Sequence, residues 1–467
     1  MSNFVLVPEA LVAAAALVLV LLGRTPRQSR RWAPLAATLV VAVALGVELW
    51  AGSALTSYFG GALVQDRFAL FAKAAILLAA GLAIAVTDWS DESAPVIGMA
   101  MILLAAFGVM IIASAADFVG LWAGLELAAA AGGVLVSVRR SDLGLRLLVA
   151  GGLASALVLI GLAFVYATTG SADLLVVRRA AASANPTLPL AIPVLLLLGG
   201  LAMRAGLPPF QFGRLSVGLG ASPLGAGIVI GLVAAAALVV AFKISAALVP
   251  LPAVLSPYLM VVAAVAMVGG GAGALATRSP RARLAYLAAG QVGWIAAGLA
   301  THYRTGLGAS LFLMGAFAVA ATAGPSAMAG ADTGEFALAG MGLLRPARAA
   351  GIALVFLSLA GAPPLGGFFG EFAVASALAA SGALWLLALG LLGAVMSLAA
   401  AVGTLRAIYL QSPPDESRRA AGARLPVLTR LSTGGAVALC VVLAGYAVFA
   451  NPIFSLADQG AKALGLR

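Results

Sequence analysis

Charged side chains are scarce along this chain of 467 residues: Asp, Glu, Lys and Arg make up 9% of it, whereas hydrophobic residues make up 63%. Average soluble domains carry about 25% charged residues, so this composition excludes a water-soluble protein. Mean hydropathy is +1.12, and apolar windows of about 20 residues, long enough to cross a bilayer, recur from one end to the other. The composition therefore predicts an all-α polytopic membrane protein.

Cysteine and histidine are almost absent. Cys440 is the single cysteine and His302 the single histidine, which excludes a disulfide framework, cysteine-ligated clusters, His-based zinc sites and haem held by two histidines. The sequence has no P-loop, and the glycine run at 269–273 lies in an apolar stretch without a preceding strand, which favours helix packing over dinucleotide binding. We therefore expect no cofactor, no metal and no redox centre in this chain.

The apolar windows predict fourteen membrane spans, with each end placed to within about three residues. The first stretch, Phe4 to Leu22, has neither a basic n-region nor an Ala-x-Ala cleavage site, which favours a retained helix over a signal peptide. The spans begin near Phe4, Pro34, Ala69, Pro95, Val119, Gly144, Leu188, Pro223, Val254, Leu284, Gly306, Ala347, Leu384 and Leu431.

The basic residues predict how the spans are oriented. The chain carries 27 Lys and Arg residues, for a formal net charge of +11. In a soluble protein that charge would suggest nucleic acid, but in short membrane loops it marks the cytoplasmic side. With the N-terminus outside, the inside loops hold most of the arginines and the outside segments hold few. We therefore expect both termini outside and no nucleic acid as a partner.

Two apolar stretches are interrupted by nearly the same sequence, Ala-Gly-x-Pro-Pro, at 205–209 and at 360–364. Proline lacks an N–H and clashes with the preceding helical turn, so Pro208, Pro209, Pro363 and Pro364 are predicted to make helices seven and twelve discontinuous. In lipid, irregular backbone persists only where protein or a water-filled cavity satisfies the freed polar groups. Paired breaks of this kind are typical of transporters built from internal repeats.

The breaks also predict the domain organisation. Pro208 and Pro363 are 155 positions apart, a separation that holds five spans, and an odd number of spans per unit inverts one unit relative to the other. The alternative is two unrelated proline kinks, because Pro and Gly are common in membrane helices. We expect an N-terminal region with helices one to three (1–94), a first repeat with helices four to eight (95–250), a second, inverted repeat with helices nine to thirteen (251–410), and a C-terminal loop, helix fourteen and tail (411–467).

Few ionisable residues lie inside the predicted spans. Each one near the bilayer centre costs at least ~2.5–3.5 kcal/mol and marks a candidate for a proton path or charge axis. Glu126 lies deep in the fifth span, Arg204 precedes the first break, Glu371 follows the second, and Lys73 lies in the third span. Four others lie near span ends, where snorkelling to the surface explains them equally well: Glu48, Asp117, Arg146 and Lys243. Of these four, Arg146 is also a candidate for the charge axis.

Glu126 admits two interpretations. It can be one partner in a structural ion pair, for instance with Arg146 of the next span, or it can hold and release a proton in a relay. A buried carboxylate next to a cation satisfies both descriptions. We favour a relay or gate for Glu126 and Glu371.

Several motifs resemble those of the antiporter-like membrane subunits of respiratory complex I, most closely the N subunits of bacterial NADH:quinone oxidoreductases. The resemblance runs from Pro8-Glu9-Ala10-Leu11 through the thirteenth span, and its most specific segments are residues 120–127, 144–146, 150–157, 284–286 and 358–370. It implies fourteen helices, two inverted five-helix units, and a polar axis along the membrane middle. Such an axis couples quinone reduction elsewhere in the complex to proton transfer.

The resemblance has further implications. The chain would be a translocase subunit without a redox cofactor of its own, in a bacterial inner membrane, surrounded by lipid and other membrane subunits that handle NADH and quinone. Glu126 matches the fifth-helix glutamate of the family. Other positions depart from the family pattern: its lysines in helices six, seven and eight fall on Arg146, Arg204 and Ala234, its two frequent histidines fall on Gln211 and Gln291, and the twelfth-helix charge, often lysine in N subunits, is Glu371.

These departures bear on the mechanism. Lysine can lose its proton when it is desolvated, whereas arginine stays charged. A protonation cycle through Arg204 or Arg146 is therefore not expected, although either can pair with Glu126. We expect proton flow through the first unit to be weakened or lost, with Glu371 serving as an exit.

Three alternatives share the predicted architecture. A subunit of a multisubunit cation/proton antiporter or of a membrane-bound hydrogenase has the same fold, and Glu371 slightly favours that class. A non-pumping scaffold subunit would keep the helices and lose the lysines. A stand-alone secondary transporter is disfavoured because no substrate-sized polar cluster accompanies the breaks in the sequence.

Overall fold

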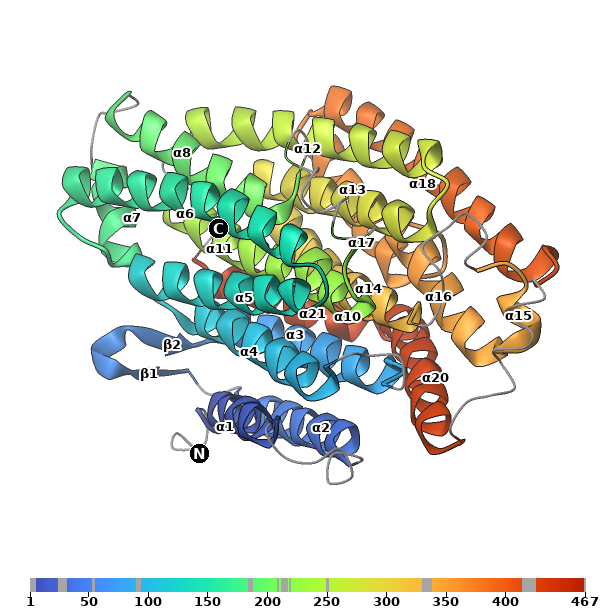
Figure 1. The fold of residues 1–467 in the computed structure, drawn as a ribbon. Helices are drawn as coiled ribbons and strands as arrows, with labels where there is room; N and C mark the ends of the chain where they lie inside the picture. Colours follow the sequence, from blue (N-terminus) through green and yellow to red (C-terminus); the bar gives the residue numbers. More distant parts are fainter. Residues whose placement is uncertain are drawn as a thin grey trace.

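The computed structural model describes residues 6–23, 32–52, 55–89, 94–183, 188–207, 210, 217, 220–248, 252–329, 338–413 and 426–465. Within these ranges, ten helices are long and apolar enough to cross a membrane. Figure 1 shows the helices packed alongside one another, with α1 and α2 along one edge beneath α3 and α4, and α12 near the opposite edge. The prediction of a helical membrane protein is thus confirmed.

Most of the long helices start within three residues of a predicted span, and the largest difference is five residues, at α20. They are α1 (Val7–Leu22), α2 (Ala33–Ala51), α3 (Arg67–Val86), α4 (Pro95–Ser114), α5 (Phe118–Arg139), α6 (Ser141–Thr169), α8 (Leu188–Ala205), α10 (Pro223–Gly227) continuing into α11 (Val233–Ala247), α12 (Pro252–Ala276), α13 (Pro280–Ala300), α14 (Arg304–Ala327), α16 (Pro346–Leu359), α17 (Gly366–Ala380), α18 (Leu384–Leu410) and α20 (Pro426–Val448).

Local sequence explains where several helices begin. A proline occupies the first or second position of α1, α2, α4, α10, α13 and α16, where its missing N–H costs nothing. Asp66 caps α3 by accepting a bond from the Ala69 N–H at 2.8 Å, and Asp117 caps α5 by accepting one from the Gly120 N–H at 2.7 Å. Each cap satisfies one of the otherwise free N–H groups of the first turn.

The first predicted break is described on its N-terminal side. Pro208 and Pro209 lie outside the described residues. Directly before them α8 ends, Gly206 adopts φ 62°, and the Leu207 N–H donates to the Ala202 carbonyl at 3.0 Å. A left-handed glycine followed by this 6→1 bond is a Schellman termination.

The second break has the same backbone geometry and is fully described. After α16 ends, Gly361 adopts φ 68° and the Ala362 N–H donates to the Leu357 carbonyl at 2.9 Å. Pro363 and Pro364 follow, and α17 begins at Gly366. The helix therefore stops and restarts here, as the sequence predicts.

Smaller elements fill the connections and the tail. A hairpin of β1 (Thr56–Tyr58) and β2 (Leu63–Gln65), joined by the short helix η3 (Phe59–Gly61), links α2 to α3. The helix α7 (Leu174–Ser183) lies between α6 and α8, and α15 (Met341–Leu344) precedes α16. An amphipathic helix, α21 (Ala450–Ala463), follows α20 and packs on α14 and α3; the sequence predicts only a tail there.

The centre of the molecule is formed by α14 and by the helix that runs from α10 to α11. In both helices, every residue of the stretch long enough to cross a membrane is buried inside the protein. The joining segment, η4 (Ile228–Leu232), is a π-helical turn, and a Cβ at Gly231 would lie 2.1 Å from Thr322 Oγ1 of α14. Only glycine allows this approach. Ala234 is fully buried in this apolar core.

Candidate functional site

Arg204 and Glu126 form an ion pair between α8 and α5. The Arg204 Nη2 donates to Glu126 Oε1, and the exposed fractions of the two side chains are 7% and 32%. Arg204 lies in the last turn of α8, where the free carbonyls favour a cation. Because Gly206 ends the helix two residues later, the break itself fixes the height at which Arg204 meets Glu126.

A cavity of about 540 Å³ opens beside this pair, between α5, α6 and α8. Gly151 of α6 leaves room for the guanidinium, since a Cβ there would lie 3.1 Å from Arg204 Nη1. The Trp122 Nε1 donates to Ser155 Oγ at 3.0 Å, which ties α5 to α6 one turn before Glu126. The pair is thus held on three helices.

Of the two arginines that the sequence offers as partners of Glu126, the structure pairs it with Arg204 and not with Arg146. Arg146 is exposed on α6, and Arg204, 78 positions from Glu126, takes the place proposed for it. Asp117 is a helix cap, in agreement with its assignment to a span end.

Glu371 lies in the second turn of α17, directly after the second break. It is 8% exposed, and its Oε1 accepts a hydrogen bond from Gln291 Nε2 of α13 at 2.6 Å. The same amide lies 3.4 Å from the Ser358 carbonyl at the end of α16. A Cβ at Gly361 would lie 2.1 Å from Glu371 Oε2, so the carboxyl group packs directly against the broken backbone.

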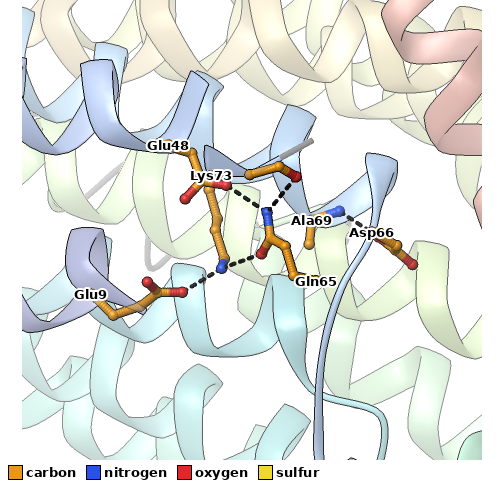
Figure 2. Close-up of polar contacts among 7 residues, drawn as sticks. Glu9, Glu48, Gln65, Asp66, Ala69 and Lys73 are labelled. Atoms are coloured by element: carbon orange, nitrogen blue, oxygen red, sulfur yellow. Dashed lines mark hydrogen bonds and ion pairs between the residues drawn. The ribbon is translucent and has the colours of Figure 1, made fainter. Parts of the chain in front are cut away.

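A second polar group lies near the N-terminus, where Lys73 of α3 is fully buried. Its Nζ donates to Glu9 of α1 and, at 2.6 Å, to Gln65 Oε1 of β2. Gln65 Nε2 in turn donates to Glu48 Oε1 of α2 at 2.7 Å and to the Gly52 carbonyl at 3.2 Å. Figure 2 shows these side chains converging from four elements. We call Glu9, Glu48, Gln65 and Lys73 the N-terminal polar cluster.

The interpretation of Glu48 and Lys243 as snorkelling side chains is wrong. Glu48 is 1% exposed and bonded within the cluster. Lys243 is 7% exposed, donates to the Ala115 carbonyl at 2.6 Å and lies 5.6 Å from the ring centre of Phe68. It lines a cavity of about 630 Å³ that Asp66 and α21 also border. Both side chains stay in the interior because polar groups meet them there.

Sequence reasoning missed three functional candidates, Glu9, Gln65 and Gln291. Glu9 occurs in the Pro-Glu motif of the first span, but nothing local indicates that a lysine 64 positions away reaches it. Gln65 and Gln291 are neutral, so a search for ionisable groups passes over them. For Gln291, one sequence feature could have indicated a role: by the resemblance described above, it stands where a histidine is frequent.

Comparison with known families shows which protein family the chain belongs to. Residues 115–397 match the profile of the family described as "NADH:quinone oxidoreductase/Mrp antiporter, TM". The chain belongs to this family. The matched region holds Glu126, Arg204, Gln291 and Glu371, whereas the N-terminal polar cluster lies before it.

Several curated relatives of this family member are named NADH-quinone oxidoreductase subunit N. NADH-quinone oxidoreductase subunit N of Granulibacter bethesdensis is 30% identical to it over 98% of both chains. Subunit N of Erythrobacter litoralis is 32% identical over 85% of both chains.

Solved structures show the same fold. A chain of respiratory complex I from Thermus thermophilus superposes with a TM-score of 0.80 at 24% identity, covering 97% of this chain and 99% of that one. A chain of the Mrp complex from Dietzia sp. gives 0.82 at 20% identity, covering 99% and 98%. These likenesses establish the shared architecture.

The chemistry available at the described sites is proton and charge chemistry. Among the described residues no group of three His, Cys, Asp or Glu is placed to hold a metal ion. What the described sites offer is a carboxyl group bonded to an amide at the second break, and a fixed ion pair at the first.

Proposed function

We propose that the chain is an antiporter-like, proton-translocating membrane subunit of a NADH:quinone oxidoreductase of the complex I type. The observation that carries this proposal is a buried charged group at each helix break: Arg204 with Glu126 at the end of α8, and Glu371 with Gln291 after α16. The full-length similarity to subunits named NADH-quinone oxidoreductase subunit N supports it.

The proposal includes fourteen spans. To the ten long apolar helices it adds the shorter α1 and α8, the arginine-bearing α13, and the pair α16–α17, which counts as one broken crossing. It also includes two inverted units, 95–250 and 251–410, flanked by residues 1–94 at the N-terminus and residues 411–467 at the C-terminus. Matching packing supports the repeat: α4, α5, α6 and α8 pack successively on one another, as do α12, α13, α14 and α17.

Under this proposal the two breaks have different roles. Arginine does not release its proton at physiological pH, so Arg204 acts as a fixed charge paired with Glu126. Glu371 is bonded to a neutral amide and can be protonated and deprotonated at the break. Proton transfer therefore uses the second unit, while Arg146 and Lys73 contribute charge outside this step.

The subunit would lie in a bacterial inner membrane with both termini outside and without a redox cofactor of its own. Its partners would be lipid and the other membrane subunits, with NADH and quinone bound elsewhere in the complex. The basic loops predicted on the inside support this orientation. Subunits of cation/proton antiporters share the fold, but the curated relatives favour the oxidoreductase.

The test is purification of the tagged chain from its native membrane in mild detergent. We expect it to bring down membrane, flavin and iron–sulfur subunits that together oxidise NADH with quinone. Deletion of its gene should abolish the assembled complex or its coupled proton transfer. Recovery with antiporter subunits or a nickel hydrogenase, and without NADH oxidation, would contradict the proposal.

A further inference from the structure

The N-terminal polar cluster contains more acidic than basic side chains, and all of them are buried. Glu9 lies near the start of α1 and Glu48 near the end of α2, whereas Gln65 ends β2 and Lys73 lies in the second turn of α3. The exposed fractions are 6% for Glu9, 1% for Glu48, 2% for Gln65 and 0% for Lys73. The cluster therefore has two carboxyl groups and one ammonium group, all away from water.

The two carboxyl groups of the cluster differ in their partners, because only Glu9 bonds to the Lys73 ammonium group. Lys73 Nζ bonds directly to Glu9, whereas Glu48 meets an amide, because Gln65 stands between Glu48 and Lys73. Glu9 Oε2 and Glu48 Oε2 are both buried, and no described residue bonds to either, so the direct bond from Lys73 is what distinguishes Glu9 from Glu48. An ionised carboxylate in such a place would lack both a paired charge and hydrogen bonds for one oxygen, which is a costly arrangement.

The charges around the cluster do not supply the missing cation. On α3, Asp66 caps the helix, and α4, which packs on α1, carries no charged residue between Pro95 and Ser114. Lys243 of α11 acts on Lys73 through space, but its own proton is directed at the Ala115 carbonyl. Within the described residues, Glu9, Glu48 and Lys73 therefore set the charge balance.

We propose that the cluster is a proton-binding site, in which Glu48 takes up one proton from water and holds it as a neutral carboxylic acid beside the Lys73–Glu9 ion pair. Uptake converts the Glu48 carboxylate and one proton into the carboxyl form, so the cluster becomes neutral. The site lies outside the charged groups at the two helix breaks. Lys73 also interacts electrostatically with Lys243 of α11. Binding of the proton at Glu48 therefore changes the electrostatic potential at α11, in the first repeat.

This inference does not rest on the proposed function, because it is tested without turnover. The test is infrared difference spectroscopy of the purified complex at neutral pH, comparing wild type with Glu48→Gln. We expect wild type to show one carboxylic-acid carbonyl band that the variant lacks and that shifts in heavy water. Glu9→Gln should also lose the band, because Glu48 then becomes the sole counter-ion of Lys73. Lys73→Met should gain a second band, since both carboxyl groups then become neutral.

Asp142→Asn is the matched control. Asp142 is exposed and forms an ion pair with Arg140, whose Nε and Nη2 donate to its two oxygens. It is therefore a carboxylate at neutral pH, and its loss should leave the band unchanged. If Glu48→Gln removes a carboxylate band instead, the proposal is wrong. Should that variant not assemble, Glu48→Asp must shift the frequency of the carboxylic-acid band, and an unshifted band overturns the proposal equally.

Discussion

The guanidinium of Arg204 meets the carboxylate of Glu126 across the gap between α8 and α5. Each group comes from a different helix, and the Schellman end of α8 places the arginine. A titratable lysine at this position could pass a proton on, but arginine keeps its charge. The pair therefore stabilises the first unit, and we assign proton transfer to the second.

Removing one partner of this pair should destabilise the protein more than removing both. Arg204→Ala leaves a carboxylate without its cation, at a cost of about 2 kcal/mol, which is below the usual range for buried pairs because Glu126 is partly exposed. The double variant Arg204→Ala/Glu126→Ala should recover most of that loss. Thermal unfolding of the purified complex measures both. Equal destabilisation by the single and double variants would show that the pair is not the cause.

Adjacent glycines on α6 test the space beside Arg204. Gly151→Val should displace the guanidinium, because a Cβ there already lies 3.1 Å from Arg204 Nη1, and should lower the melting temperature. Gly152→Val is the control, since nothing lies within 4 Å of its Cβ position. If the two variants melt alike, crowding of Arg204 is not the explanation.

A second glycine pair tests the packing of Glu371 against the break. Gly361→Ala adds left-handed strain of about 1–2 kcal/mol and also pushes Glu371 away, since a Cβ would lie 2.1 Å from its Oε2. Gly382→Ala adds the strain alone, because Gly382 has φ 77° and open space. We expect fewer protons moved per electron for Gly361→Ala and no change for Gly382→Ala. An equal number of protons moved per electron in both variants would show that Glu371 has no part in proton transfer.

The amphipathic helix α21 should be held less firmly on α14 at acid pH. Asp458 accepts two bonds from Arg304, Nε–Oδ1 at 2.8 Å and Nη2–Oδ2 at 2.6 Å, which lower the pKa of Asp458. The stabilisation is thus present above the usual aspartate pKa of about 3.9 and is lost as pH falls through the lowered value. At neutral pH, α21 should exchange hydrogen modestly faster in Asp458→Asn than in the wild type. At strongly acid pH, the variant and the wild type should exchange at the same rate. An equal difference at both pH values would argue against this ion pair.

The helices and their breaks could be predicted from the sequence because local rules govern them. Twenty apolar residues specify a span, and Gly-x-Pro-Pro specifies an interruption wherever it occurs. The end of α16 and the start of α17 follow directly from Gly361, Pro363 and Pro364.

The partners of the charged residues could not be predicted in the same way. Whether Glu126 meets Arg146 or Arg204 depends on which way α6 and α8 face, and nearly uniformly apolar helices carry little information on their rotation. The cluster around Lys73 depends on a hairpin that brings Gln65 between α2 and α3. Such long-range contacts become visible once the helices are packed.

Proton transfer at the second break is tested most directly by the number of protons moved per electron by the reconstituted complex with Glu371→Gln. This variant keeps the shape of the side chain and removes the proton site beside Gln291. We expect a lower ratio for Glu371→Gln and an unchanged ratio for assembled Arg204→Ala. A wild-type ratio in Glu371→Gln would show that this subunit does not transfer protons at its second break.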